Sequence, residues 1–599
     1  MGLIGRPVPG AFILLAAALT PGPRASLAAQ QPTPPDTALV QDTARAAQDT
    51  AAPDTLPPPT LFPAAPAAVP RAPALTRYWD HSALLSRGVL TMADVLEFVP
   101  LLQPIRAGFL EGPQASIFAG GGAVGLRYRA DGYELAPIAG GPLDLHLLPL
   151  VEVQDLWLTR VPGGYELSSV SYENERREPY SRIEAGTGDR DANLIRAFFA
   201  GRFVGGPFGF GFDRIDTDGQ PQLGSSERTV VWGKWAHELP GGVWGQVELR
   251  KTSADRDSFP AANRTDWILR LRRPLGAGWQ ADLVGGSASV TRTPVSLAGI
   301  PDSLADVGRD FGARQAALRV GRSGEHSRTL ALVRVWDGDG VPAVESEASI
   351  DLSAGPLDLH LSGRVEEWDE FRAESGLAGL VLRLPLGLRL LAEAEDGARG
   401  LFGGIPVARE LFTRVSAGGE LVVGRWRLGG RGGRWRVEPS PTLGLPFDSA
   451  GPQLRGRTVN IGEGWVGGPL LRLFGGEVEG GFRYRARDQG PFLYWPQDEW
   501  RLEGVYHYAG VHGQLDIWLR GFGGVRGPLL APDPEAAPVG IASTGPLNWF
   551  FAELVVRVRD VHLYYNYEFF DSAEVLGDLP AFELPRSRYH FGVKWEFWN

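Results

Sequence analysis

From about residue 180 to the C-terminus, apolar and polar residues alternate with a period of two in many separate segments. One segment has apolar or small residues at every second position (Leu357, Leu359, Leu361, Gly363, Val365) and polar residues between them (Asp358, His360, Ser362, Arg364, Glu366). Residues 478–487 and 550–559 repeat the pattern, and similar segments begin near Val243, Trp267, Ala331, Leu388, Trp500 and Leu515. Successive side chains on a strand point to opposite faces, so this pattern predicts strands with one apolar and one charged face.

The number of these segments favours a membrane barrel over a soluble sheet. So many strands without intervening helices would need a very large sandwich, and a propeller would repeat a blade motif every ~40 to 50 residues, which this sequence lacks. A closed barrel leaves no unpaired edge and lets lipid cover the apolar face, and a tilted strand of ~10 residues crosses the hydrocarbon layer. We therefore expect a large antiparallel transmembrane β-barrel over residues 180–599, with roughly 16 to 22 strands and 22 favoured.

The last segment has aromatic and apolar side chains on one face. They are Tyr589, Phe591, Val593, Trp595 and Phe597, and His590, Gly592, Lys594 and Glu596 alternate with them. A final strand of this kind resembles the signal that the barrel-assembly machinery reads in outer-membrane proteins, which implies that the aromatic face contacts lipid. One departure is that polar Asn599 follows Trp598 at the C-terminus, where that signal has an aromatic residue.

The N-terminus predicts export from the cytoplasm. Arg6 precedes an apolar run from Ala11 to Leu19, and Ser26-Leu27-Ala28 supplies the small residues of a cleavage site, which together indicate a signal peptide over residues 1–29. Residues 30–75 are rich in Pro, Ala, Thr and Asp and poor in large apolar side chains, so we expect a disordered periplasmic tether. Together with the barrel pattern, the signal peptide predicts location in the cell outer membrane.

Residues 76–179 have the mixed helix and strand pattern of a small α+β domain. Thr91 is a suitable N-cap for a helix through Val99, with Pro100 ending it. Strands are expected at Gly125–Tyr128 and Val151–Thr159, separated by turns such as Asp131-Gly132.

Composition and motifs exclude several function classes. The net charge of −11 disfavours nucleic acid as a partner, and the absence of Cys excludes disulfides and thiolate chemistry. The G-x-S-x-G, H-E-x-x-H and P-loop patterns do not occur in the sequence. Single histidines on the predicted inner face (His360, His507, His562) are expected to line the lumen, and the charged run Glu479, Arg483, Arg485 and Arg487 to form a salt-bridged wall. We expect no enzyme, metal site or cofactor.

Three stretches of the small domain resemble the plug of TonB-dependent receptors. Met92–Pro100 is similar to its early helix, Tyr128–Leu135 to its strand and Asp-Gly turn, and Leu147–Arg160 to the stretch that ends its core. Gly163–Leu167 and Tyr172–Pro179 match the segment before the barrel poorly. The resemblance implies a plug inside the barrel, a small ligand taken from outside, and a TonB-type energising partner.

The same resemblance points to a partner-binding segment in the tether. Asp36, Thr37, Ala38, Leu39 and Val40 look like the family's TonB box, which the energising protein grasps by strand addition. The Asp-Thr pair also recurs at Asp42-Thr43, Asp49-Thr50 and Asp54-Thr55, so the match lies in a repetitive tract.

Two functions remain open from the sequence. The first is an outer-membrane receptor and transporter of the TonB-dependent kind for an unidentified ligand. The second is a porin-like or structural barrel that is not coupled to energy. Short connections such as Pro240–Gly242 favour the second, because capture of a large ligand usually uses long outer loops.

Overall fold

The structure of the protein is a computed structural model. It describes residues 75–598 except 98, 100–101, 107, 119–124, 137–142, 175–177, 260, 294–309, 401–408, 438–456, 489–493, 511–513, 534–539, 572–575 and 580–581. The expected signal peptide, the tether and the candidate TonB box Asp36–Val40 lie outside these residues. None of the helices in the described ranges has the length and apolar character to span a membrane.

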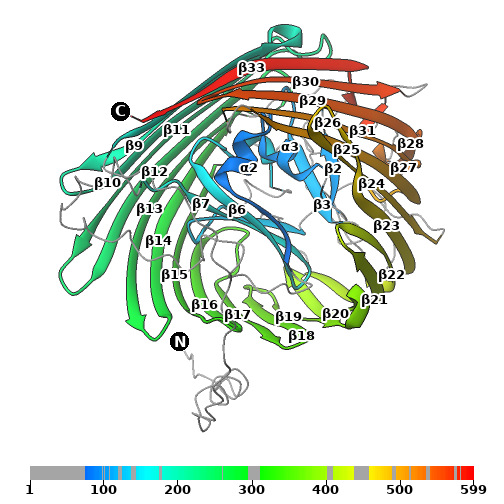
Figure 1. The fold of residues 1–599 in the computed structure, drawn as a ribbon. Helices are drawn as coiled ribbons and strands as arrows, with labels where there is room; N and C mark the ends of the chain where they lie inside the picture. Colours follow the sequence, from blue (N-terminus) through cyan, green and yellow to red (C-terminus); the bar gives the residue numbers. More distant parts are fainter. Residues whose placement is uncertain are drawn as a thin grey trace, which may run out of the picture. The chain divides into compact units, whose positions relative to one another are not determined.

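Twenty-two antiparallel strands form a closed barrel, which confirms the favoured strand number (Figure 1). They are β8 (Tyr180–Gly188), β9 (Asn193–Phe203), β10 (Gly206–Thr217), β11 (Ser226–Leu239), β12 (Val243–Arg256), β13 (Ala261–Gly276), β14 (Trp279–Thr293), β15 (Phe311–Ser323), β16 (Ser327–Gly338), β17 (Val344–Ala354), β18 (Leu357–Glu367), β19 (Arg372–Arg383), β20 (Leu388–Gly400), β21 (Arg409–Val423), β22 (Trp426–Val437), β23 (Arg457–Leu473), β24 (Gly476–Arg487), β25 (Asp498–Gly510), β26 (Leu515–Arg526), β29 (Leu547–Val558), β30 (Val561–Asp571) and β33 (Ser587–Trp598). Each pairs with the next in chain order, and β33 closes the ring by pairing with β8 from Trp598↔Tyr180 to His590↔Gly188.

All barrel strands except β8 are longer than the ~10 residues that crossing the bilayer requires. The strands run from 9 residues in β8 to 17 in β23. Several continue beyond the apolar part of their outer face into polar positions, so they extend past the hydrocarbon layer instead of ending at it. Four of the predicted segments, at Val243, Leu357, Leu388 and Leu515, begin at the first residue of a strand.

The two ends of the barrel differ in their connections. At one end two-residue turns such as Val204-Gly205, Ala277-Gly278 and Phe474-Gly475 have positive φ at both positions (48° and 76°, 50° and 78°, 49° and 82°), the geometry that matches the twist of the flanking strands. At the other end the connections include the hairpins β27 (Leu529–Asp533)–β28 (Gly540–Thr544) and β31 (Leu576–Leu579)–β32 (Phe582–Glu583). Barrels of this class carry short turns on the periplasmic side, so we assign the Val204 end to the periplasm.

The part of the chain before Tyr180, here called the plug, is an α+β unit. Its elements are β1 (Leu75–Trp79), α2 (His81–Leu85), α3 (Met92–Leu96), β2 (Leu102–Arg106), β3 (Gln114–Phe118), β4 (Leu126–Ala130), β5 (Tyr133–Glu134), the 3-10 helix η2 (Leu145–Leu147), β6 (Val153–Val161) and β7 (Gly164–Ser171). The sheet has the order β1-β6-β7-β4-β5, and β2 and β3 form a separate hairpin. Two further 3-10 turns, η3 (Asp189–Asp191) and η4 (Pro385–Gly387), lie between barrel strands.

Local sequence explains the plug elements that were predicted. Thr91 and Asp94 form a capping box at the start of α3, whose Met92, Val95 and Leu96 are buried. The helix ends at Leu96, three residues earlier than the sequence indicates. Asp131 and Gly132 have φ of 48° and 89°, so the predicted turn between β4 and β5 is a tight hairpin turn.

The barrel strands present their apolar face outward and their polar face inward. In β33, Tyr589, Phe591 and Trp595 are 40%, 46% and 54% exposed, whereas His590 and Lys594 on the other face are 4% and 3% exposed. The inward residues are buried because the plug covers them: Lys594 Nζ, for example, donates to Arg87 O of the plug (2.5 Å). Figure 1 shows α2, α3 and the plug sheet ringed by the barrel strands.

We predict that Val593→Arg destabilises the folded barrel by about 2 to 4 kcal/mol, because it places a charge on the outer face near the middle of the bilayer. Ser587→Arg, in the same strand but at its extracellular end, is the control and is expected to cost about 0 to 1 kcal/mol. Urea unfolding from lipid vesicles measures both variants. Equal stability of the two variants would contradict the lipid-facing assignment of β33.

Candidate functional site

The interface between the plug and the inner wall of the barrel is the most extensive polar site in the described chain. Plug groups contact side chains of many strands around the wall, including β9, β12, β16, β17, β20, β26, β29, β30 and β33. Most of the inward charged residues on these strands are less than 9% exposed. The plug therefore replaces the water that a charged lumen would otherwise hold.

A five-residue segment between α2 and α3 is held by its backbone. Arg520 Nη1 donates to Ser86 O (2.6 Å), Lys594 Nζ to Arg87 O (2.5 Å), Asn566 Nδ2 to Gly88 O, and Arg196 to Val89 O (3.2 Å) and Leu90 O. In return, Gly88 N donates to Glu553 Oε2 (2.7 Å). We call residues 86–90, with Arg196, Arg520, Glu553, Asn566 and Lys594, the clasp.

The clasp satisfies backbone groups that have no partner in a helix or sheet. A buried carbonyl without a hydrogen bond costs about 1 to 3 kcal/mol, so five consecutive carbonyls need outside donors. Barrel carboxylates orient these donors: Arg196 contacts Asp213 (2.9 Å) and Arg520 contacts Glu553 (2.6 Å). The clasp side chains are therefore held in place by the wall and point toward the plug.

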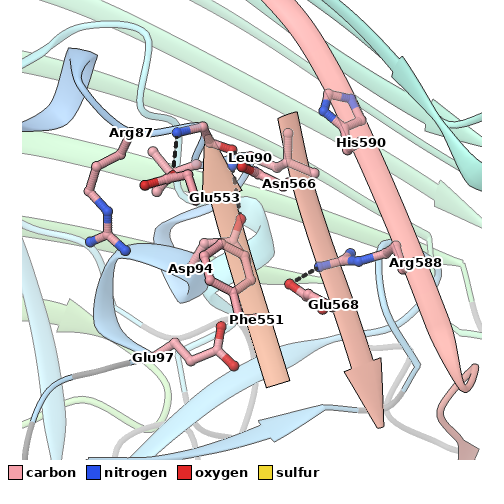
Figure 2. A pocket seen from close by; sticks show the side chains of 12 residues that line it. Arg87, Leu90, Asp94, Glu97, Phe551, Glu553, Asn566, Glu568, Arg588 and His590 are labelled. Carbon is pink, nitrogen blue, oxygen red and sulfur yellow. Dashed lines mark hydrogen bonds and ion pairs between the residues drawn. The ribbon is translucent and has the colours of Figure 1, made fainter. Parts of the chain in front are cut away.

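Beside the clasp lies a small pocket between α3 and strands β29, β30 and β33, shown in Figure 2. Three of its carboxylates, Asp94, Glu97 and Glu568, have oxygens within 4.8 Å of one another. Each already has partners: Asp94 accepts from the backbone of Leu90 (2.8 Å) and Thr91, Glu97 pairs with Arg106, and Glu568 with Arg588 (2.8 Å). With a volume of about 10 Å³ the pocket has room for one water. Two arginines supply the positive charge, so the cluster joins plug to wall and is a poor cation site.

Glu97 is the titratable group of this pocket. Burial raises its pKa to about 7, with Arg106 opposing the rise and Glu568 and Asp94 adding to it. Its backbone carbonyl also accepts from Arg501 Nη1 (3.0 Å), which ties the end of α3 to β25. The protonation of Glu97 therefore changes the charge of the plug–wall contact near neutral pH.

A second set of contacts joins the plug sheet to β16 and β17. Arg127 and Arg129 of β4 pair with Glu345 (2.5 Å) and Glu347 (2.7 Å), and Glu134 of β5 pairs with Arg334. Burial alone would raise the pKa of Glu134, but Arg127, Arg334 and Arg129 hold it down at about 2. Removing one member of a buried pair leaves an uncompensated charge and typically costs about 3 to 5 kcal/mol. This network fixes the orientation of the plug sheet against the wall.

The predicted inward histidines and charged wall have defined partners. His360 contacts Asp351 (2.6 Å) and Ser362 (3.1 Å), His507 contacts Asp516 (3.3 Å), and His562 lies 4.0 Å from Glu596. Arg483 pairs with Glu463 (2.7 Å) and Arg485 with Glu499 (2.5 Å), while Arg487 donates to Trp495 O (2.7 Å) and Glu479 pairs with Arg425. The Ser362–His360–Asp351 group lines a cavity of about 80 Å³ between the plug sheet and the barrel wall.

Sequence reasoning placed some residues here and missed others. The face opposite Tyr589, Phe591, Val593, Trp595 and Phe597 supplies Lys594 to the clasp. The clasp itself was missed, because a side chain that donates to a distant backbone carbonyl leaves no motif. Lys594 and Arg87, for example, are 507 positions apart in the chain.

We predict that Gly88→Ala weakens the clasp by about 1 to 3 kcal/mol, because a Cβ at this position would lie 2.5 Å from Asn566 Oδ1 and 2.9 Å from Tyr564 Cδ2. Limited proteolysis of the folded protein should then cut faster between residues 80 and 95. Gly521→Ala is the matched control, since a Cβ there meets nothing within 4 Å. Unchanged protection of this segment in Gly88→Ala would show that the clasp is not a close fit.

We predict that the contribution of Glu97 to the stability of wild type falls as pH rises from about 4.5 to about 7, because folded Glu97 keeps a proton that the unfolded chain, with its ordinary pKa of 4.5, has lost. Glu97→Gln should be near neutral at pH 4.5 and more stable than wild type at pH 8 by on the order of 1 to 3 kcal/mol. Urea unfolding in micelles at both pH values measures this. Glu325→Gln, on a side chain 88% exposed, is the control. A difference between Glu97→Gln and wild type that does not change with pH would contradict the prediction.

Comparisons with known proteins identify the fold. No protein-family model and no curated relative matches the sequence. Among solved structures, the FrpB iron transporter from Neisseria meningitidis aligns with a TM-score of 0.64 at 8% identity, over 88% of this chain and 100% of that one.

Two receptors align equally well. The siderophore receptor PirA from Acinetobacter baumannii has a TM-score of 0.64 at 9% identity, over 88% of this chain and 99% of that one. The ferric enterobactin receptor PfeA from Pseudomonas aeruginosa has a TM-score of 0.65 at 10% identity, over 88% and 98%. At such identities the likeness establishes the fold. The chain therefore has the plug-and-barrel fold of TonB-dependent outer-membrane receptors, as the resemblance of its N-terminal domain predicted.

Proposed function

We propose that the protein is an outer-membrane receptor that imports a small ligand and is opened by a TonB-type energising partner. The observation that supports this most is the plug, which is held in the barrel by hydrogen bonds and ion pairs to many strands. A lumen filled in this way excludes free diffusion. It also requires an outside source of work before anything can pass.

The order of the plug–barrel contacts along the chain agrees with displacement of the plug by a force applied at its N-terminal side. After the tether comes β1, an edge strand that pairs only with β6 within the described sheet (Trp79↔Leu156, for example). Then follow α2 and the clasp at residues 86–90, ahead of α3 and most of the sheet. A force on the tether therefore peels β1 first and reaches the clasp next, where one segment is attached to five barrel residues. The energising protein would deliver that force by pairing, as an added strand, with the main chain of Asp36–Val40.

We propose an iron chelate or a similar small chelate as the ligand class. The solved structures of this fold include an iron transporter, a siderophore receptor and a ferric enterobactin receptor by their own descriptions. On the extracellular side the plug meets aromatic and cationic groups of the barrel, such as Phe109 beneath Arg588 (3.8 Å to the ring centre) and beside Phe570 (5.8 Å). Phe109 and Phe570 are 3% and 7% exposed and Arg588 pairs with Glu568, so these groups hold the plug against the wall. We propose transport and no catalytic role.

The alternative is a barrel that keeps the fold without energy coupling. One brief extracellular connection, residues 189–192 between β8 and β9, supports it, because it leaves little chain to enclose a ligand. However, the extracellular connection between β22 and β23 spans residues 438–456, and the short turn Pro240–Gly242 lies at the periplasmic end. The buried inner wall argues against the porin form of this alternative. Binding of the energising protein distinguishes an energy-coupled receptor from an uncoupled barrel.

We predict that the full-length protein in detergent binds the C-terminal domain of a TonB-type protein, and that Thr37→Pro weakens this binding on the order of tenfold or more, since proline removes a main-chain donor from the added strand. Thr50→Pro is the matched control, because it alters the third of the four Asp-Thr pairs and leaves Asp36–Val40 unchanged. Isothermal titration measures the three proteins. Absence of binding by wild type, or equal binding by both variants, would favour the uncoupled barrel.

A further inference from the structure

The plug covers the inner wall of the barrel unevenly. Near the periplasmic ends of β11, β13 and β14 the inward side chains of Lys234, Arg272 and Asp282 are 2%, 3% and 0% exposed. In the periplasmic halves of β20, β21, β22, β24 and β25, inward charged side chains are 13% to 49% exposed. We call these residues the open wall: Arg389, Glu420, Arg431, Glu479 and His507.

The open wall faces the periplasm only. Toward the extracellular ends of the same strands, the inward residues Glu410, Trp435 and Arg485 are 1%, 5% and 5% exposed. Arg160 of the plug pairs with Glu395 (2.5 Å) on β20, which marks one edge of the open wall. Water therefore reaches the open wall from the periplasmic side, and the covered upper part of the wall separates it from the outside.

Close contacts at inward glycines show where the plug touches the wall. A Cβ at Gly286 on β14 would lie 2.6 Å from the ring of Tyr133, which belongs to the plug. At Gly429 on β22 the nearest atoms belong to the wall itself, in the ring of Trp465 (2.5 Å). The plug is therefore in tight contact with β14 and stands away from β22 at this level.

Inward glycines also keep this part of the wall thin. By strand alternation and register, the inward glycines of β21 to β24 are Gly418, Gly429, Gly433, Gly467 and Gly481. Because these positions carry no side chain, larger neighbours lie flat along the wall, as Trp465 does over Gly429 and Glu503 over Gly481 (2.6 Å). The wall therefore projects less into the lumen here than a wall of larger residues would.

The charges of the open wall pair with one another or with neighbours on the wall. Arg389 pairs with Glu420 (3.2 Å), and Arg431 pairs with Glu463 of the adjacent strand (3.0 Å). At β16 and β17, by contrast, wall carboxylates pair with arginines of the plug. Moving the plug away from the open wall therefore breaks few ion pairs, whereas moving it from β16 and β17 leaves buried charges uncompensated.

The plug element that borders the open wall is β1. The charges of Glu503 on β25 and Arg483 on β24 act on Arg77 of β1. β1 is also the strand that a force on the tether would peel first, since it pairs only with β6 within the described sheet. Its removal would widen the space that the open wall already borders.

We propose that the imported ligand crosses the barrel between the plug and the open wall, through the space that β1 leaves. This inference rests on the proposed function and adds to it the path of the ligand. The plug stays attached to β16 and β17 while its opposite side opens, so only part of it has to move. Along this path the ligand meets glycines and paired charges of both signs.

The test places a single thiol on each side of the inner wall of the full-length protein, because the chain has no cysteine. Ser416→Cys lies inward on β21, opposite Gly433, and the control Thr252→Cys lies inward on β12, where Thr252 is 4% exposed. Both changes nearly preserve side-chain volume, and heat-dependent mobility on gels checks that each variant folds. We expect a charged maleimide to label Ser416→Cys faster than Thr252→Cys on the order of tenfold.

Planar bilayers then measure the opening itself, with potassium chloride as the probe. Urea below the concentration that unfolds the barrel releases the least stable part of the plug first, and the current reports the space that opens. Maleimide added from the periplasmic side during the recording should lower the current of Ser416→Cys by about half, because the label narrows the open space. The currents of wild type and Thr252→Cys should not change.

Three results would overturn the proposal. An equal drop of current in the two variants would mean that the plug leaves the lumen as one body. The other two are an unchanged current in labelled Ser416→Cys and the absence of current at every urea concentration that keeps the barrel folded. Binding of the TonB-type domain by the unlabelled variants reports separately on the proposed function, because neither substitution touches Asp36–Val40.

Discussion

Buried charge on the inner wall of the barrel is the constraint on which the rest of the structure depends. Arginines and carboxylates on the inward faces would be hydrated in an open lumen, and here water is largely replaced by the plug. Desolvation of an ion costs several kcal/mol unless geometry and hydrogen bonds compensate. Arg129 with Glu347 (2.7 Å) and Arg160 with Glu395 (2.5 Å) show how that compensation is achieved, through close pairs between the two parts of the chain. The plug is therefore specified by charge as much as by shape.

A polar interface of this kind differs from an apolar one in how it separates. When an apolar interface opens, hydration of the exposed surface is unfavourable. Arginines and carboxylates, by contrast, regain favourable hydration as the plug moves. The net free energy of each pair is consequently small compared with its Coulomb attraction. A plug seated by polar contacts can be firmly oriented at rest and still be displaced without a large net loss. The apolar core of the plug, built around residues such as Met92, Tyr128 and Leu156, lies mainly on its own side of the interface.

The sequence was informative where structure is set by local periodicity. Alternation along β18, β24 and β29 reveals two faces, and repeating it over the chain leads to a barrel and its approximate size. The Asp131-Gly132 turn and the capped helix at Thr91 follow from residues close together in sequence. Pairings over long separations could not be predicted this way. Arg129 and Glu347 are 218 positions apart, and nothing in either strand marks the other as its partner. The clasp is even harder to predict from the sequence, because the plug contributes backbone groups to it and no side-chain motif. Gly88 is the one clasp residue whose type indicates a close approach. The roles of Asp36–Val40 and of the aromatic face of β33 stay predictions.

The pairing of β33 with β8 joins the two ends of a 420-residue region. The clasp contacts strands at both of these ends, so it is relevant to how the barrel closes. One of its donors, Arg196, is on β9 at the beginning of the barrel, and the other donors are on β26, β30 and β33 at its end, where β29 supplies the acceptor Glu553. A single short segment of plug thus binds both sides of the seam. Joining two ends of a long chain carries an entropy cost that grows with the logarithm of its length. A template that holds both ends removes much of that cost, so the plug, which is made before any barrel strand, can act as an internal guide for closure and then remain inside the ring it helped to complete.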